Sequence, residues 1–281
     1  MRFPKIIHQI WFQGEDNLPV QYKKYSDTWK NKHKDYEHMI WDSESIETLI
    51  DTHYSKYKDA YLALPKMIQK IDYAKYFIIH RFGGIYTDMD TECLKSIDPL
   101  LRSSTTDLLI PDMGLDFFEK LTTGCMSKKL YNNSFIVSTR LNPVWKGVHL
   151  SIKHMSIKQK WNESNFNYIF RTTGPKMLSD VLNRYNSSYA PVIGIIENNL
   201  IDPIKWCDYE GPDNIDRDKI QNAFSIQHWG SKSSDTSISW SSNKEMFAGI
   251  CLCQLKKLWW LVLLVLILLL LQRTGVTRVS I

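Results

Sequence analysis

The chain has 281 residues, of which 43% are hydrophobic and 12% aromatic. This is enough apolar material for one large α/β domain with short additions. The net charge of +5 is mild, and acidic residues are interspersed among the lysines. No basic stripe indicates a nucleic-acid partner, so this class of function is set aside.

Short β-rich segments alternate with helical patterns along the chain. Strands are predicted at residues 5–12, 37–41 and 85–90, and helices at 19–32 and 45–64. Further strands are predicted at 108–111, 134–138 and 191–196, and residues 172–175 form a turn that opens a helix. Strands that alternate with helices at this rhythm predict an α/β domain with a largely parallel sheet.

The helix that follows Pro65 has an apolar stripe suited to packing on that sheet. Its apolar residues recur at spacings of three and four, and the helix is predicted to end at Gly83 and Gly84. The stripe consists of Ile68, Ile71, Ala74, Ile78 and Phe82. The two glycines would also let the backbone approach a ligand closely.

Two aspartates end the strand that follows, Asp88 and Asp90. At this two-residue spacing both carboxylates point to the same side of a strand. They can share one hard divalent cation, whose remaining positions take phosphate oxygens and which neutralises a departing diphosphate. Taken alone the pattern is weak, because such pairs are often solvated turn residues.

Asp72 and Lys75 lie one helical turn apart on the preceding helix. One interpretation is a surface ion pair that contributes under about 1 kcal/mol to stability. The other is a donor site, in which the carboxylate binds sugar hydroxyls and the ammonium contacts a diphosphate. The sequence leaves both open.

The whole run from Asp72 to Asp90, DYAKYFIIHRFGGIYTDMD, resembles the signature of the DXD-containing sugar-binding glycosyltransferases, glycosyltransferase family 32. This family includes yeast-type mannosyltransferases, some of which mannosylate inositol phosphorylceramide. The family pattern is roughly D-x-x-R-Y, a hydrophobic stretch, and G-G-x-Y-x-D-x-D. Lys75 replaces the usual arginine, which keeps the charge but loses the two-pronged fork. The matching residues are Asp72, Tyr76, Gly83, Gly84, Tyr86, Asp88 and Asp90.

Other segments resemble the family more weakly. Residues 4–14 are similar to its first strand, so His8 and Trp11 are candidates for contacting the base or ribose, or else are core residues. Residues 227–231 are similar to its closing H-x-x-G-S segment, in which His228 is either a metal ligand or a loop histidine. Residues 37–42, 133–136 and 173–175 also match weakly.

The resemblance implies a GT-A type, Rossmann-like nucleotide-sugar-binding domain and a retaining, metal-dependent hexosyltransferase. Mannose is the favoured sugar, the donor is GDP-mannose or a UDP-hexose, and the acceptor is a glycan or glycolipid. Mn²⁺ or Mg²⁺ would be held by Asp88, Asp90 and His228, with the two aspartates catalytic. The alternative is a catalytically inactive, membrane-anchored protein that binds a sugar nucleotide or glycan. The implied donor-binding residues are His8, Trp11, Asp72, Lys75, Tyr76, Gly84, Tyr86 and Asp88.

The C-terminal part of the chain differs from the rest. Residues 258–271 are uninterruptedly apolar, with Lys256 and Lys257 before them and Arg273 after them. A buried core helix is one interpretation, but a single-pass membrane anchor of a Golgi- or ER-type protein is favoured. Positive charge on both flanks leaves the orientation open. The predicted domains are a catalytic domain at 1–230, a Ser-rich linker at 231–254, and an anchor with a short tail at 255–281.

Overall fold

The computed structural model describes residues 2–123, 129–188, 193–230 and 243–273. The chain divides into two compact units, Met1–Trp240 and Ser241–Ile281. The first half of the predicted Ser-rich linker, residues 231–242, lies outside the described residues.

The first unit is built on one large mixed sheet and one small antiparallel ladder. The large sheet has the strand order β2-β1-β3-β6-β5-β7, and the ladder joins β4 to β8. The strands are β1 (Ile6–Ile10), β2 (Glu37–Trp41), β3 (Gly84–Thr87), β4 (Thr91–Cys93), β5 (Leu108–Pro111), β6 (Phe135–Ser138), β7 (Ile193–Ile196) and β8 (Ser225–Gln227). The strands predicted from β-rich composition are therefore present, although most are shorter than predicted.

Strand direction differs from the prediction at one point. The pairs β1–β2, β1–β3 and β5–β7 are parallel, as expected for an α/β domain. Strand β6 runs antiparallel to both of its neighbours, β3 and β5. An antiparallel strand within an otherwise parallel sheet is common in α/β folds, and the alternation of strands and helices does not reveal it.

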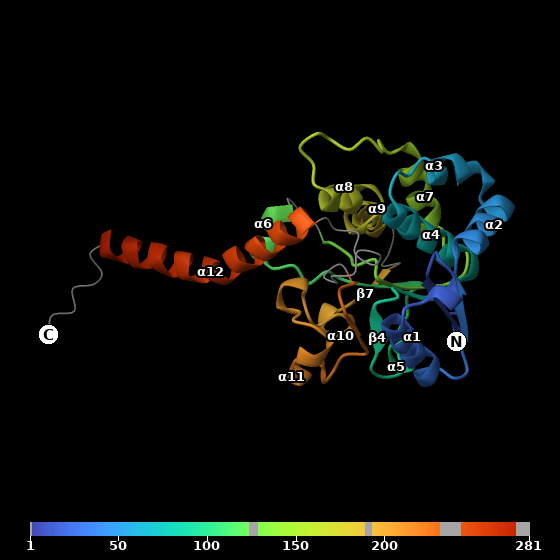
Figure 1. The fold of residues 1–281 in the computed structure, drawn as a ribbon, viewed down its shortest axis with the longest axis horizontal. Helices are drawn as coiled ribbons and strands as arrows, with labels where there is room; N and C mark the ends of the chain where they lie inside the picture. Colours follow the sequence, from blue (N-terminus) through green and yellow to red (C-terminus); the bar gives the residue numbers. More distant parts are fainter. Residues whose placement is uncertain (1, 124–128, 189–192, 231–242, 274–281) are drawn as a thin grey trace. The chain divides into compact units, whose positions relative to one another are not determined.

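Helices cover both faces of the sheet (Figure 1). One face carries α2, α3, α4, α7, α8 and α9, and the other carries α1, α5, α10 and α11. The longer helices are α1 (Val20–Lys32), α2 (Ser43–His53), α4 (Met67–Phe82), α7 (Val144–His154), α8 (Asn165–Thr172) and α9 (Pro175–Ser188). The shorter ones are α3 (Lys58–Leu62), α5 (Asp98–Ser103), α6 (Phe117–Thr123), α10 (Asn198–Ile201) and α11 (Arg217–Ile220). The α/β prediction is confirmed.

The single helix predicted at 45–64 is divided into α2 and α3. Asp42 caps α2, because its carboxylate accepts a hydrogen bond from the backbone N–H of Ser45 at 2.8 Å. The helix ends at Tyr54, which leaves helical geometry with a φ of −135°. The Tyr54 ring packs on Phe77 with ring centroids 4.7 Å apart. The helix therefore breaks where this aromatic ring is buried against α4. The sequence does not predict the break, because it has no glycine or proline at this position.

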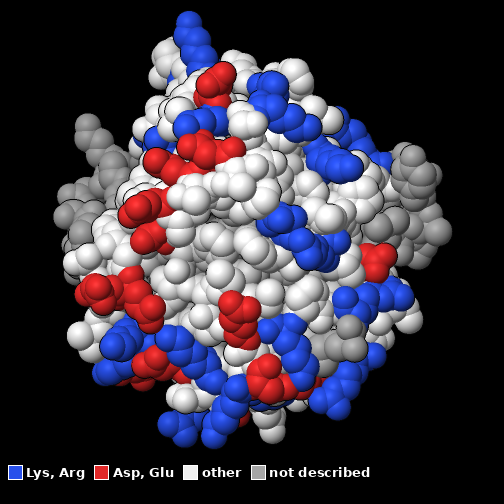
Figure 2. All heavy atoms as spheres, turned by 90° about the vertical axis from the view of Figure 1, so that its right-hand side faces the viewer, with Lys and Arg blue, Asp and Glu red and all other residues white. Residues whose placement is uncertain are grey.

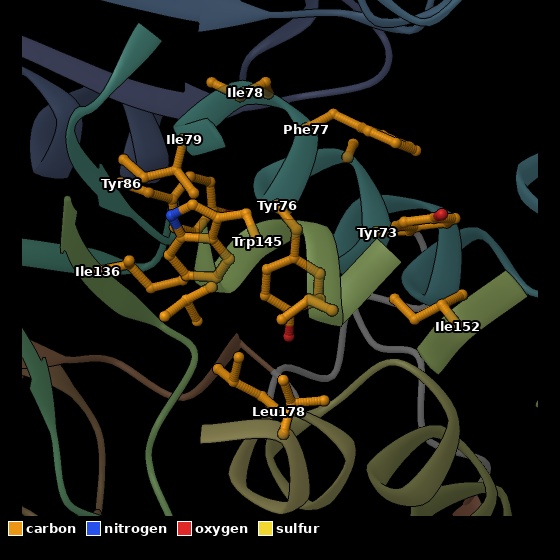
Figure 3. Packing of buried hydrophobic residues seen from close by; sticks show 14 of the residues in the cluster. Tyr73, Tyr76, Phe77, Ile78, Ile79, Tyr86, Ile136, Trp145, Ile152 and Leu178 are labelled. Carbon is orange, nitrogen blue, oxygen red and sulfur yellow. The ribbon is translucent and has the colours of Figure 1, made fainter. Parts of the chain in front are cut away.

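Helix α4 is the central element of the larger core (Figure 3). Its residues from Asp72 to His80 are all buried, so the helix is covered on every side rather than along the predicted stripe alone. Tyr73, Tyr76 and Phe77 pack among side chains of α7, α9 and the sheet. A helix enclosed in this way places its polar residues inside the protein, and these must find partners there.

The second unit contains helix α12 (Asn243–Arg273). Residues 243–254, predicted as linker, belong to this helix. Its segment Cys251–Leu271 has 21 residues and a mean hydropathy of 2.1, so it qualifies by length and composition as a candidate membrane span. At 1.5 Å per residue it extends about 31 Å, close to the thickness of a bilayer's hydrocarbon core. The predicted apolar helix is present, although such a segment is weak evidence of a membrane by itself.

Candidate active site

The candidate site lies where the parallel strands β1 and β3 end. Strand β3 stops at Thr87, and Asp88 begins a tight turn rather than continuing the strand. The N–H of Thr91 bonds the carbonyl of Asp88 at 3.2 Å, and the chain then enters β4. The prediction that Asp88 and Asp90 stand on one face of a strand is therefore wrong, since both belong to the turn that joins β3 to β4.

The two glycines at the start of β3, Gly83 just before it and Gly84 as its first residue, are needed for packing of the chain. Gly84 has a φ of +88°, and a Cβ there would lie 2.5 Å from the carbonyl oxygen of Ile6 in β1. Gly83 has a φ of +66°, and a Cβ would lie 2.6 Å from the backbone nitrogen of Arg140. Both positions therefore exclude any other residue. The close approach that Gly84 permits is to the neighbouring strand, and this differs from its predicted contact with donor.

Lys75 forms a buried ion-pair network with both Asp72 and Asp88. Its Nζ lies 3.1 Å from Asp72 Oδ1 and 3.1 Å from Asp88 Oδ1, and its side chain is only 2% exposed. Burial alone would lower the pKa of Lys75, but the charges of Asp88 and Asp72 outweigh it and raise the pKa. The surface-pair interpretation is therefore wrong. The ammonium joins the helix to the turn that carries Asp88.

The Asp72 carboxylate is engaged by the protein on both oxygens. Oδ1 also accepts a hydrogen bond from Asn133 Nδ2 at 2.9 Å, and Oδ2 accepts one from Thr173 Oγ1 at 3.1 Å. Tyr76 completes this layer, because its hydroxyl donates to the Thr173 carbonyl at 2.8 Å and accepts from Asn133 at 3.1 Å. Asp72 and Tyr76 thus hold together the buried hydrogen-bonded group of Asp72, Lys75, Tyr76, Asn133 and Thr173, which forms the floor of the site.

Asp88 is held by one of its two oxygens. Oδ1 accepts from Lys75 and, at 2.7 Å, from the hydroxyl of Tyr86. The Asp88 side chain is 26% exposed, and the hydrogen bonds to its carboxylate within the described residues all end on Oδ1. Oδ2 is therefore the oxygen available to a ligand. Tyr86 lies beneath the site as a positioning residue for Asp88, and its ring also faces the Lys75 ammonium at 4.9 Å.

Asp90 is held by the end of β8 and the segment that follows it, and the Gln227 side chain also hydrogen-bonds its carboxylate. Its Oδ2 accepts a hydrogen bond from the Gly230 N–H at 2.7 Å, and its carbonyl accepts one from the His228 N–H at 2.8 Å. Burial and the nearby Asp88 charge together raise the pKa of Asp90 to about 6. Residues 140 positions apart in the sequence thus meet at this carboxylate.

His228 is brought to the same region, but both of its ring nitrogens have protein partners. Nε2 lies 2.8 Å from Glu92 Oε2, and Nδ1 lies 3.1 Å from the Tyr209 hydroxyl. The ring stacks on Tyr25 with centroids 4.0 Å apart. His228 would have to exchange one of these partners to bind a metal, so its role as a ligand stays a prediction.

His8 makes its contacts away from the two aspartates, whereas Trp11 packs against the apolar group that contains Met89, the residue between them. His8 is fully buried; its Nδ1 accepts from Trp41 Nε1 at 3.2 Å, and its Nε2 donates to the Gly83 carbonyl at 3.0 Å. The His8 side chain thus hydrogen-bonds β1 to β2 and to the C-terminal end of α4. Trp11 is half-buried just after β1, where its indole packs on Tyr22 with centroids 5.4 Å apart. Trp11 thus remains near enough to the surface for a ligand, whereas His8 does not.

The oxygen atoms that the site offers as metal ligands fit a hard divalent cation. Asp88 presents a carboxylate oxygen that has no hydrogen-bond partner in the described parts of the chain, and Asp90 adds a second carboxylate two residues away. Carboxylate oxygens are the ligands that Mn²⁺ and Mg²⁺ favour. In the described parts of the chain, no three side chains of His, Cys, Asp and Glu lie together in an arrangement that could hold an ion. Phosphate oxygens and water would therefore supply the other ligands.

Sequence reasoning gave no role to several residues that shape the site. Asn133 and Thr173 lie in segments noted only as weak matches, yet both bond to Asp72. Glu92 and Tyr209 bond the His228 ring and carry no sequence signal of their own. Such partners come from distant elements, so local patterns cannot identify them.

The first unit's surface carries charges of both signs. Figure 2 shows acidic and basic side chains intermingled on the one face that it draws. No charged patch on that face competes with the aspartate cluster as the candidate site.

Comparisons with known proteins point to the same segment. Residues 19–107 match the family of the glycosyltransferase sugar-binding region containing DXD motif. The chain is 40% identical over 107 residues to an initiation-specific alpha-1,6-mannosyltransferase of Candida albicans, covering 36% of this chain and 28% of that protein. It is 33% identical over 107 residues to inositol phosphoceramide mannosyltransferase 1 of Schizosaccharomyces pombe, covering 37% and 33%. The resemblance inferred from the sequence is confirmed.

A third relative matches over a longer stretch. An uncharacterized glycosyltransferase of Acanthamoeba polyphaga mimivirus is 28% identical over 205 residues, covering 71% of this chain and 73% of that protein. Among solved structures, galactosyltransferase LgtC is similar with a TM-score of 0.45 and 11% identity, covering 87% of this chain and 94% of that one. The matches to the two fungal mannosyltransferases span about a third or less of those proteins' length.

Proposed function

We propose that the chain is a glycosyltransferase that moves a hexose, with mannose favoured, from a nucleotide-sugar donor to a glycan or lipid acceptor. The observation that supports this most directly is that Asp88, two residues from Asp90, is bonded through Oδ1 to Lys75 and Tyr86, while its Oδ2 has no hydrogen bond within the described residues. The family match includes both aspartates, and two of its relatives are named as mannosyltransferases. GDP-mannose is therefore the first donor to test, followed by UDP-hexoses.

In this proposal Asp88 and Asp90 hold Mn²⁺ or Mg²⁺ together with the donor diphosphate. The cation would neutralise the charge that develops on the departing nucleotide diphosphate. Lys75 and Tyr86 keep Asp88 in place by bonding its other oxygen, which reduces the rearrangement needed when donor binds. The Gly230 amide likewise keeps the Asp90 carboxylate in place by bonding its Oδ2.

The proposed stereochemical course is retention of the anomeric configuration. The acceptor hydroxyl would attack on the face from which the diphosphate departs, and its proton would pass to a phosphate oxygen of the leaving group. This course requires no side-chain nucleophile. Asp72 does not provide one in this arrangement, because Lys75, Asn133 and Thr173 occupy its oxygens.

We place the acceptor at a membrane in this proposal. The candidate span Cys251–Leu271 is long enough to cross a bilayer, and one relative is named as an inositol phosphoceramide mannosyltransferase. A lipid acceptor and a membrane-anchored enzyme, in a Golgi- or ER-type membrane, are consistent with both observations. The side of the membrane that the first unit faces is left open.

The proposal is tested by donor turnover with the full chain in detergent micelles. GDP- and UDP-sugars are assayed with Mn²⁺, with and without chelator, and Asp90→Asn serves as the matched variant. We expect one donor to be turned over, and turnover to stop with chelator and in Asp90→Asn. Metal-dependent nucleotide binding without turnover, across glycan and lipid acceptors, would favour the inactive sugar-nucleotide-binding alternative. A folded chain with neither would refute the donor site.

A further inference from the structure

Trp229 has an unusual backbone conformation directly beside the aspartate turn. Its φ is +47°, and the only other non-glycine residue with positive φ in the described parts of the chain is Leu141, at +57°. Side chains with a Cβ avoid this left-handed region, and β-branched residues avoid it most strongly. Such a residue persists only where surrounding contacts impose the conformation, and it often does so at functional sites.

The surrounding contacts show what this conformation achieves. Strand β8 pairs with β4 up to Gln227, opposite Thr91, and the His228 amide continues the pairing to the Asp90 carbonyl. The turn at Trp229 then directs the next amide, that of Gly230, to the side chain of Asp90 at 2.7 Å. One segment therefore bonds both the backbone and the carboxylate of the same aspartate.

The Trp229 side chain anchors the turn. Its indole Nε1 donates to the carbonyl of Ile204 at 2.8 Å, in the segment that follows α10. The ring is half-buried, and Ile204 is buried. The anchor and the left-handed backbone together hold the Gly230 amide at Asp90.

We propose that Trp229 is a positioning residue, which through Gly230 fixes the Asp90 carboxylate in the orientation that binds the cation. This inference rests on the proposed function, in which Asp90 is a metal ligand. Trp229 itself touches neither cation nor donor in this account. A carboxylate that a hydrogen bond already holds in one orientation loses little side-chain entropy when it binds a metal. A carboxylate that rotates freely loses more, so it binds the metal more weakly.

Two substitutions at Trp229 separate the effect of its positive φ from the effect of its indole ring. Trp229→Gly and Trp229→Val both remove the indole, but glycine adopts positive φ freely whereas valine is β-branched and strongly disfavours it. Leu141→Gly and Leu141→Val are the matched controls, because Leu141 has the same kind of φ and its N–H bonds to His80 at 2.8 Å, away from the aspartates. Trp229→Phe removes the hydrogen bond to Ile204 and part of the ring, but keeps an aromatic side chain.

Two readouts are measured on the full chain in detergent micelles. Mn²⁺ affinity is titrated by electron paramagnetic resonance, and exchange of the Gly230 amide is followed in metal-free protein by hydrogen–deuterium exchange. We expect Trp229→Val to weaken Mn²⁺ binding by about tenfold and to speed Gly230 exchange. Trp229→Gly should stay within about threefold of wild type, with Trp229→Phe between the two. Neither Leu141 variant should alter Mn²⁺ affinity.

The outcomes distinguish this inference from the function on which it rests. Mn²⁺ affinity and Gly230 exchange that match wild type in both the valine and the glycine variant of Trp229 would overturn it. Weakening of Mn²⁺ binding by Leu141→Val to the same extent would also overturn it, because the effect would then be general destabilisation. If wild type bound no Mn²⁺, the proposed function would fail, and Gly230 exchange would still decide whether Trp229 maintains the contact with Asp90.

Discussion

Removal of the buried ammonium of Lys75 is the most informative perturbation of the site's floor. Lys75→Met keeps a long unbranched side chain but leaves Asp72 and Asp88 without their shared cation. Each Nζ–Oδ1 distance is 3.1 Å, which at an effective dielectric constant of about 20 corresponds to roughly 5 kcal/mol of attraction per contact. Desolvation of the ions opposes this gain, so the net loss expected on breaking a buried pair is about 3–5 kcal/mol.

The loss should depend on pH in a defined direction. Burial raises the pKa of Asp72, and Lys75 is the main influence opposing that rise. Without Lys75 the folded protein holds a proton on Asp72 more tightly than the unfolded chain does. A group whose pKa is raised on folding stabilises less as pH increases. The deficit of Lys75→Met relative to wild type should therefore grow from pH 5 to pH 7.

The assay is urea unfolding of the full chain in fixed micelles, followed by tryptophan fluorescence. Lys30→Met is the matched control, because Lys30 pairs with Glu15 at 3.2 Å with both side chains largely exposed, and it should be nearly neutral. Lys75→Met combined with Asp72→Asn should recover part of the loss. A Lys75→Met deficit no larger than that of Lys30→Met, or one independent of pH, would refute the buried network.

Three further predictions concern other parts of the structure. Burial lowers the pKa of His8 to about 4, so the free energy of unfolding should fall as pH drops below 6.5. Between pH 7 and pH 5 this histidine alone should lower it by about 2 kcal/mol. The measurement is urea unfolding at both pH values, compared between wild type and His8→Gln. Gly84→Ala should destabilise by more than about 2 kcal/mol, because its Cβ would meet the Ile6 carbonyl at a positive φ, and an unchanged thermal midpoint would contradict this. Asp90→Asn should abolish Mn²⁺ binding yet raise the metal-free thermal midpoint, because it removes a carboxylate whose charge is buried and is also repelled by Asp88. A lowered midpoint would show that the Gly230 contact outweighs both effects.

The class of fold and the segment that carries the candidate site can both be predicted from the amino-acid sequence. Alternation of apolar strands with helices predicts an α/β domain, because each period reflects how an element buries one face. The run from Asp72 to Asp90 needed no tertiary information to be identified, since its residues lie on one helix, one strand and the turn after it. The apolar composition of α12 likewise predicts its helix directly.

The contacts that these residues make with one another follow from the three-dimensional fold. It places Lys75 between two carboxylates, ends β3 before Asp88, and buries both nitrogens of His8 in protein contacts. It also brings Asn133 to Asp72 from 61 positions away, and Gly230 to Asp90 from 140. The physical reason is that hydrogen bonds and ion pairs act over a few ångströms in space, whereas sequence patterns report only neighbours along one element.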